Sequence, residues 1–325
     1  MNKKIKEIDF DKINLIDIEK IKDKVIIITG PTASGKSAAA IELCKVIGGE
    51  IVSADSMQIY RGMNIGTAKP SLAQQQGIPH HMIDLIDPIN TYSVAQYVKD
   101  ASVIIQDIFR RGKIPVVCGG TGQYVSALID GTVFTSIDSS NDIREALESE
   151  LKEKGIIQLY NELEKIDPDA ARTLHINDVK RILRAIEVFR LTGFTKSQLN
   201  KISREKGPEF ECVSFCITHD REILYERINN RVDSMIEHGL IIEIKRLLED
   251  FPALSEIVHQ AIGYKEFIPY LRGEMTLNES IEIVKQSTRN YAKRQLTWFR
   301  KIVPLIWICN QDTKQVTETI INNFK

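Results

Sequence analysis

The stretch "VIIITGPTASGKSAAAIEL", residues 25–43, decides the fold class of this 325-residue chain. Within it, Gly30 to Ser37 match the phosphate-binding pattern G-x-x-x-x-G-K-[ST], between a β-branched run and a helix-forming one. In such a strand–turn–helix setting, backbone N–H groups and the helix N-terminus point at phosphate oxygens. The sequence therefore predicts a P-loop α/β protein in which a diphosphate or nucleotide is bound by Gly30, Pro31, Thr32, Ala33, Ser34, Gly35, Lys36 and Ser37.

Two side chains at the end of this loop define its chemistry. Lys36 supplies a full positive charge, and the Ser37 hydroxyl is placed to ligate Mg²⁺, the expected cofactor. The loop recognises a pyrophosphate-like group, which both ATP and a prenyl diphosphate carry. The motif alone therefore leaves the identity of the ligand open.

Short apolar runs alternate with helical patterns along most of the chain, which is typical of a parallel sheet wrapped by helices. The strand candidates besides residues 24–29 are "EIVSA" (50–54), "KIPVVCGG" (113–120), "ECVSFCIT" (211–218), "VPLIWIC" (303–309) and, more weakly, "HHMIDLI" (80–86). From about residue 138 the chain instead reads almost entirely as helix. We predict a charged leader over 1–22, a P-loop NTPase-like core over 23–137 and 206–325, and a helical insert over 138–205.

Composition limits the possible classes of protein. The net charge of −1 excludes an overall basic nucleic-acid-binding surface, although local basic patches remain compatible with it. Five cysteines without a CxxC pair predict reduced core thiols, and the spacing of Cys212, Cys216 and His219 does not match a zinc module. There is no signal-peptide pattern and no apolar run of roughly 20 residues. We expect a cytoplasmic monomer with no membrane partner.

Polar residues follow two of the predicted strands. Asp55 comes after "EIVSA", and Thr121 lies in a second glycine-rich turn, "VVCGGTGQY" (116–124). Because ligands bind at the carboxyl ends of parallel strands, both residues are site candidates. Asp55 could ligate a metal, accept a proton, or merely close the next turn together with Ser56.

Two stretches carry clustered positive charge. Residues 285–301, "KQSTRNYAKRQLTWFRK", contain no acidic residue and interleave aromatic ones, and "VKRILRAIEVFR" (179–190) places arginines on a helix of the insert. A basic helix is most often only a solvated face. A folded RNA, however, requires such local charge together with a place for an unstacked base.

The motifs together give the chain a family resemblance. "GPTASGKS", "SADSMQIYRGMNIGTAKP", "GIPHHMIDLIDP", "GGTGQY", "NDVKRILRAIEVFRLTG", "RVDSMIEHGL" and "YAKRQLTWFR" occur in this order from about residue 24 to 301. In this respect the chain resembles the tRNA dimethylallyltransferases, also called tRNA isopentenyltransferases. One departure is "HIND" at 175–178, where the family commonly has proline at the second position.

The resemblance implies transfer of a dimethylallyl group from dimethylallyl diphosphate to N6 of adenine 37 in tRNA, with diphosphate leaving. It implies that the P-loop holds the leaving group, that Asp55 is the general base, that Thr121 lies at the reacting end and that Arg231 reaches the diphosphate. The insert would clamp the anticodon stem-loop. The implied tRNA contacts are Asp55, Ser56, Met57, Gln58, Thr121, Arg144, Lys180, Arg181, Ile182, Leu183 and Arg184.

Three alternatives remain open at the level of the residues. A P-loop kinase for a small metabolite would turn over ATP. An adenylate isopentenyltransferase acting on free AMP would need neither the helical insert nor the basic stretch at 285–301. A non-catalytic RNA-binding module would leave Asp55 and Thr121 idle.

Overall fold

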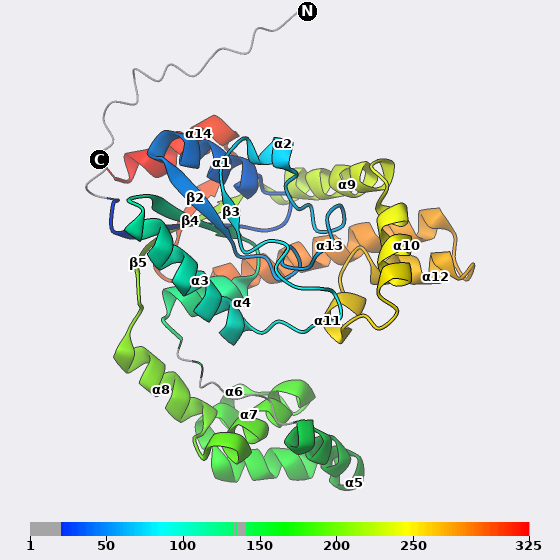
Figure 1. Cartoon of the computed structure of the whole chain (residues 1–325). Helices are drawn as coiled ribbons and strands as arrows, with labels where there is room; N and C mark the ends of the chain where they lie inside the picture. The colour runs from blue at the N-terminus through cyan, green and yellow to red at the C-terminus, as the bar shows by residue number, and fades with distance from the viewer. Residues whose placement is uncertain (1–20, 133, 135–140, 325) are drawn as a thin grey trace, which may run out of the picture. The chain divides into compact units, whose positions relative to one another are not determined.

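A parallel sheet forms the centre of the unit that contains the P-loop (Figure 1). The computed structural model describes residues 21–132, 134 and 141–324, so nearly all of the predicted leader lies outside the described residues. In space the strands follow the order β3-β2-β4-β1-β5-β6, and neighbouring strands are parallel. Their bounds are β1 Lys24–Thr29, β2 Gly49–Ser53, β3 His80–His81, β4 Ile114–Gly119, β5 Glu211–Thr218 and β6 Ile306–Cys309.

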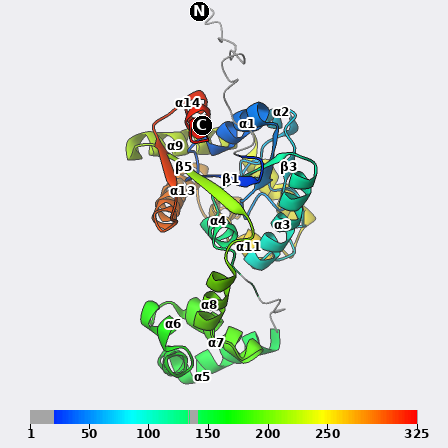
Figure 2. The same ribbon diagram turned by 90° about the vertical axis from the view of Figure 1, so that its left-hand side faces the viewer.

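The P-loop strand β1 lies between β4 and β5 and is buried on both faces. Ile26, Ile27 and Ile28 are fully buried, with Ile28 opposite Cys118 of β4 and Phe215 of β5. Helices cover both faces (Figures 1 and 2): α1 (Lys36–Ile47) and α14 (Thr313–Asn322) one, α3 (Val94–Arg110) and α4 (Gly122–Ile129) the other. Near-continuous apolar strands suit a parallel sheet covered in this way. The predicted α/β core is confirmed.

A set of helices after β5 adjoins the P-loop. α9 (Arg221–Glu237) and α13 (Leu277–Phe299) pack together through Leu224, Ile228 and Ala292, which form one apolar cluster with Ala33 of the P-loop. A capping box of Thr276 and Glu279 begins α13. The shorter helices of this region are α10 Leu240–Asp250, α11 Glu256–His259, η3 Lys265–Phe267 and α12 Ile268–Leu271, and α2 (Leu72–Gln75) follows the loop after β2.

Residues 127–209 form a separate compact unit. Its helices are α5 Asn141–Ile166, α6 Pro168–Thr173, α7 Val179–Thr192 and α8 Lys196–Lys206. They enclose an apolar core that includes Leu147, Leu163, Ile182 and Ile186. This unit is wider than the predicted insert over 138–205. The reason is that the two connecting segments touch each other: a Cβ on Gly131 would lie 2.3 Å from the Gly207 carbonyl oxygen.

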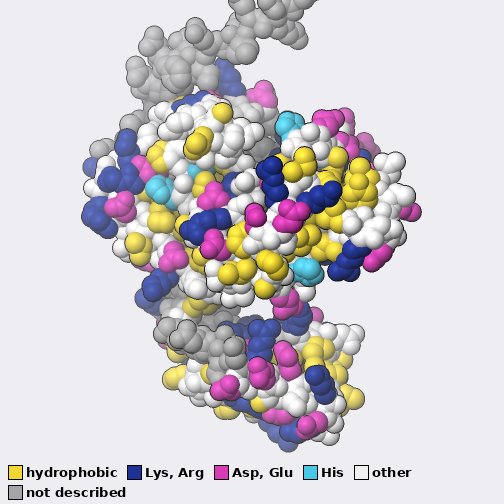
Figure 3. Space-filling view, turned by 45° about the vertical axis from the view of Figure 1, so that its right-hand side comes forward, with side chains coloured by type: hydrophobic (Ala, Val, Ile, Leu, Met, Phe, Trp, Pro, Cys, Tyr) yellow, Lys and Arg dark blue, Asp and Glu magenta, His cyan; other side chains and the backbone are white. Residues whose placement is uncertain are grey.

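Within the described part of the chain, no helix is both long enough and apolar enough to span a membrane. On the face shown in Figure 3, basic and acidic side chains are interspersed rather than segregated. This mixture accords with the net charge of −1.

Candidate active site

The loop between β1 and α1 has the backbone curvature that a phosphate cradle requires. Gly30 (φ 150°) and Gly35 (φ 92°) adopt positive φ, and Ala33 also does so (φ 63°). A Cβ on Gly30 would lie 2.3 Å from the carbonyl oxygen of Ile217 in β5, so only glycine fits there. The Lys36 ammonium donates to the Pro31 carbonyl at 3.2 Å. The loop therefore curls around its own lysine.

Two arginines of α9 flank this loop. The Arg227 guanidinium donates to the Ala33 carbonyl at 2.8 Å, and Arg231 donates to the Thr32 hydroxyl at 3.5 Å. Burial lowers the pKa of Arg231, and the charge of Arg227 lowers it further. Burial also lowers the pKa of Lys36, to which Arg231 contributes, while Cys118 and Asp55 oppose the shift. A bound polyanion would offset the repulsion between these neighbouring cations and favour their charged forms.

The loop opens into a large cleft of about 1530 Å³. Its wall combines the P-loop, the segment after β2, residues 64–76, the inner sides of α9 and α13, and residues 260–264. Lys36, Ser37, Asp55 and Arg231 all line it. Of the predicted diphosphate-binding residues, Thr32, Ala33, Gly35, Lys36 and Ser37 thus line the same space as the predicted base, whereas Gly30, Pro31 and Ser34 do not.

Asp55 follows β2 directly and closes a turn. Its Oδ1 accepts hydrogen bonds from the backbone N–H groups of Met57 (2.9 Å) and Gln58 (3.4 Å). Both bonds are made to Oδ1, so Oδ2 takes no part in this turn. The capping role and a chemical role are thus compatible, because they use different oxygens.

Thr121 lies in the loop between β4 and α4, beside Asp55. Its N–H donates to the Ala54 carbonyl at 3.1 Å, and its Oγ1 accepts from the Ser56 N–H at 2.9 Å and donates to the Ser56 hydroxyl at 3.3 Å. A Cβ on Gly119 would lie 2.1 Å from the Ala54 carbonyl oxygen. Glycine at that position lets the two loops touch, and Thr121 meets the residue that follows Asp55.

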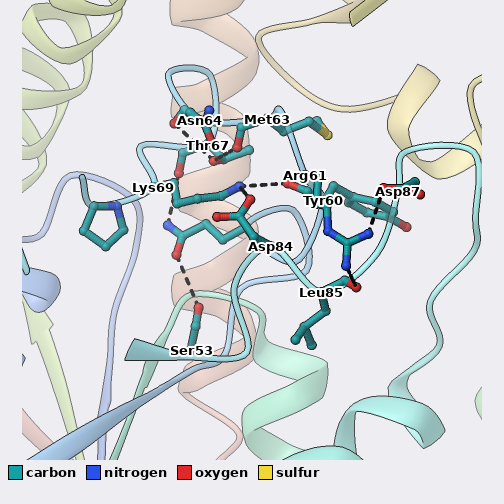
Figure 4. Close-up of polar contacts among 12 residues, drawn as sticks. Ser53, Tyr60, Arg61, Met63, Asn64, Thr67, Lys69, Asp84, Leu85 and Asp87 are labelled. Atoms are coloured by element: carbon teal, nitrogen blue, oxygen red, sulfur yellow. Dashed lines mark hydrogen bonds and ion pairs between the residues drawn. The ribbon is translucent and has the colours of Figure 1, made fainter. Parts of the chain in front are cut away.

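Further contacts fix the segment after Asp55 (Figure 4). The Gln58 amide accepts from the Ser53 hydroxyl at 3.3 Å and donates to the Thr67 carbonyl at 3.2 Å. Lys69, whose side chain is only 4% exposed, is paired with Asp84. Gln58 lines the cleft with Ser56 and Met57, but its amide is engaged in holding the cleft wall.

The buried face of α13 supplies two residues that sequence reasoning missed. Tyr291 and Gln295 line the cleft, and burial raises the pKa of Tyr291. The charge pattern of residues 285–301 predicts a basic surface with interleaved aromatic residues, not a cleft lining. The i, i+4 spacing of these two polar residues, with Ala292 between them on the apolar side, is the signal that could have indicated an inward face.

The basic residues of the stretch 285–301 divide into two groups. Lys285 is paired with Asp233, and Arg289 donates to Asn229. The exposed members are Lys293, Arg294, Arg300 and Lys301, and the Arg294 guanidinium lies over the Tyr291 ring. This second group presents positive charge at the surface.

The remaining predicted tRNA contacts belong to the helical unit. Arg144, Lys180, Arg181 and Arg184 are exposed, and Leu183 is half-buried. Arg184 is paired with Glu187, Arg181 with Asp178 and Arg144 with Glu148. Ile182 is fully buried in the core of this unit, so its side chain cannot be an RNA contact; it anchors the helix that carries the others.

Among the described residues, no group of three or more His, Cys, Asp or Glu side chains is arranged to hold a metal ion. All five cysteines are free thiols. Cys44, Cys118 and Cys216 are buried as core thiols, whereas Cys212 is half-buried and Cys309 is exposed, so the prediction of core thiols is wrong for Cys309. Cys118 lines the cleft beside Lys36, but burial raises its pKa to about 11, so it is a neutral thiol at pH 7.

Comparison with known proteins identifies the family. The sequence pattern described as IPP transferase matches residues 58–302, and that described as isopentenyl transferase matches 23–87. The chain is 48% identical over 303 residues to a tRNA dimethylallyltransferase of Acetivibrio thermocellus, covering 93% of this chain and 96% of that one. It is 46% identical over 311 residues to that of Carboxydothermus hydrogenoformans, covering 94% and 100%.

Solved structures agree. A full-length tRNA isopentenylpyrophosphate transferase from Bacillus halodurans is 41% identical, with a TM-score of 0.69 and coverage of 93% of this chain and 95% of that one. A eukaryotic dimethylallyltransferase acting on tRNA is 34% identical, with a TM-score of 0.79 and coverage of 90% and 75%. The chain therefore belongs to the IPP transferase family.

Proposed function

We propose that this protein transfers the dimethylallyl group of dimethylallyl diphosphate to N6 of adenine 37 in tRNA and releases diphosphate. The observation that carries the proposal is the meeting of two loops at one cleft. Asp55 and Thr121 are joined through Ser56, and Asp55 lines the same cleft as Lys36 and Arg231 of the cationic loop. A proton acceptor thus faces a site built for a diphosphate.

At the donor end, the P-loop binds the diphosphate as a leaving group. Its backbone N–H groups, Lys36 and Arg231 stabilise the negative charge that develops as the allylic C–O bond breaks. Mg²⁺ commonly binds through one or two protein oxygens, substrate phosphates and water, and the Ser37 hydroxyl in the cleft lining offers one such oxygen. Ser37 would hold the ion, which supplies further charge neutralisation at the diphosphate.

At the acceptor end, the adenine amine is a poor nucleophile because its lone pair is delocalised into the ring. As N6 forms its bond to the allylic carbon, it must lose a proton, and Asp55 accepts that proton. The electron pair of the broken C–O bond leaves with the diphosphate. Thr121 orients the segment that follows β2 through its hydrogen bonds with Ser56. The base must first leave its stack to enter the cleft.

The tRNA is held by local positive charge. The exposed residues Lys293, Arg294, Arg300 and Lys301 contact phosphates, and the arginines of the helical unit clamp the anticodon stem-loop. We place this activity in the cytoplasm and in a monomer. Family membership supports tRNA rather than a small metabolite as acceptor.

One assay tests the proposal against the alternatives. Labelled dimethylallyl diphosphate is incubated separately with unmodified tRNA, AMP and ATP, with and without Mg²⁺. We expect label on tRNA alone and only with Mg²⁺. Label on AMP would indicate an adenylate isopentenyltransferase. Phosphoryl transfer from ATP would indicate a kinase, and tRNA binding without any transfer would indicate a non-catalytic module.

A further inference from the structure

We propose that Gln295 is a positioning residue that holds two loops at a fixed separation. One is the P-loop, which binds the leaving group. The other is the loop between β4 and α4 that carries Gly120 and Thr121, here called the acceptor loop. Gln295 lies on α13 and its side chain is buried, with the residue only 5% exposed. The inference rests on the proposed function, because it assigns the two loops to the two ends of the transfer reaction.

The Gln295 amide joins the two loops directly. Its Oε1 accepts from the backbone N–H of Thr32 in the P-loop at 2.9 Å, and its Nε2 donates to the carbonyl of Gly120 at 2.8 Å. A primary amide offers an acceptor and a donor at a fixed separation and carries no charge. It can therefore bind an N–H of one loop and a C=O of the other without adding charge beside the diphosphate.

The glycines of the acceptor loop match this contact. A Cβ on Gly120 would lie 2.4 Å from Gln295 Nε2, and a Cβ on Gly122 would lie 2.5 Å from the Trp298 ring. The Trp298 indole N–H also donates to the Ser126 hydroxyl at 2.8 Å. Because the glycines of "GGTG" have no side chain, α13 can approach the loop closely at two points, Gln295 and Trp298, about one helical turn apart.

The two partners of Gln295 adjoin the two halves of the chemistry. Thr32 receives Arg231 on its hydroxyl, and Gly120 precedes Thr121, which contacts Ser56 beside Asp55. A displacement needs the attacking and leaving atoms in line, and a misplacement of about 1 Å can cost roughly 10²-fold in rate. Loosening the Gln295 bridge would therefore reduce turnover more than it reduces binding of either substrate.

The test compares the same substitution at two positions of α13. Gln295→Met preserves length and removes both hydrogen bonds, whereas Gln286→Met changes an exposed residue outside the cleft lining. We expect Gln295→Met to lower kcat about 10–100-fold, while KM for dimethylallyl diphosphate and Kd for tRNA change by less than about threefold. Gln286→Met should match the unsubstituted protein.

Two further variants separate positioning from stability. Gln295→Asn retains the amide but is too short to reach both loops, so it should behave like Gln295→Met and also covers the case in which the Met variant does not fold. Phe299→Leu, at a fully buried position of the same helix, lowers stability without removing a side-chain hydrogen bond to either loop. It should retain kcat at temperatures where it remains folded.

A double-substitution cycle with Thr121→Ala gives the decisive readout. If Gln295 acts through the loop of Thr121, the combined loss in kcat is smaller than the product of the two single losses. The inference would be overturned if the loss in kcat of the double variant equalled the product of the two single losses, or if Gln295→Asn retained full kcat. An unsubstituted protein that prenylates no tRNA would instead refute the proposed function.

Discussion

At the scale of single residues, the site combines structural and chemical duties in the same side chain. Asp55 closes a turn with Oδ1. Thr121, in the loop between β4 and α4, accepts a hydrogen bond from the Ser56 N–H. The sequence allowed Asp55 to be a turn residue, a metal ligand or a base. Geometry shows that the first role does not exclude the third, because Oδ2 is not used in the turn.

Asp55→Asn separates these two roles. The amide oxygen of Asn can still accept from Met57 and close the turn, but the amide cannot accept a proton from the adenine amine. We expect kcat to fall about 10²–10⁴-fold, the usual contribution of a general base, with Kd for tRNA nearly unchanged. Single-turnover kinetics and filter binding measure the two quantities. An Asn variant with normal turnover would leave Asp55 only its structural role.

Glycines were the least predictable residues of the site. The pattern at Gly30 and Gly35 indicates a phosphate loop by itself, since the motif is local. Gly119 and Gly120, in contrast, are required by contacts with Ala54 and Gln295, which lie far away in the chain. Sequence periodicity carries no information about such contacts. The i, i+4 spacing of Tyr291 and Gln295 could indicate an inward face of the helix, but not that Gln295 would contact Gly120.

At the scale of elements, the strands and the P-loop helix followed from local pattern. β1, β4 and β5 lie within the predicted apolar runs. The weak candidate at 80–86 forms a strand only at His80–His81. There, His81 and Arg111 of the turn after α3 converge on the buried carboxylate of Glu50 in β2.

This carboxylate cluster predicts a pH dependence of stability. Hydrogen bonds from Arg111, and secondarily from His81, lower the pKa of Glu50 to about 2. Because the folded-state pKa lies below the ordinary value of 4.5, the cluster stabilises the fold above that value, and this contribution is lost as pH falls toward 2. Glu50→Gln should lower the free energy of unfolding by about 1–3 kcal/mol at pH 7.

Urea unfolding at pH 7 and pH 3 measures this effect. The difference between Glu50→Gln and the unsubstituted protein should shrink at the lower pH. Glu318→Gln is the control, because its pair with Lys314 is exposed on α14 and should contribute little. Equal effects of the two substitutions would contradict the role of Glu50.

The basic face of α13 gives a second prediction for an element. Replacing the exposed Lys293 and Arg300 by Gln should weaken tRNA binding and reduce the slope of log Kd against log salt by roughly 0.7–0.9 per lost phosphate contact. Lys285→Gln is the matched control, because that lysine is paired with Asp233. A salt titration of tRNA affinity distinguishes them, and an unchanged slope in the double variant would place the RNA elsewhere.

At the scale of the whole molecule, the chain joins a P-loop core to a helical unit over 127–209. The helical insert predicted over 138–205 lies inside this unit, whose wider bounds include the contact between Gly131 and Gly207. A P-loop most often indicates ATP. Here the cationic loop and Asp55 line one cleft, and Thr121 contacts Ser56 beside Asp55. This arrangement suits a diphosphate that departs rather than a phosphoryl group that is passed on.

The most direct measurement follows the fate of that diphosphate. The protein is mixed with unmodified tRNA and dimethylallyl diphosphate in the absence of ATP, and both released diphosphate and prenylated adenosine are counted, the latter by mass spectrometry of the digested tRNA. We predict one diphosphate per prenyl group, with the modification at adenine 37. A requirement for ATP hydrolysis, or diphosphate release without prenylated tRNA, would contradict the central claim.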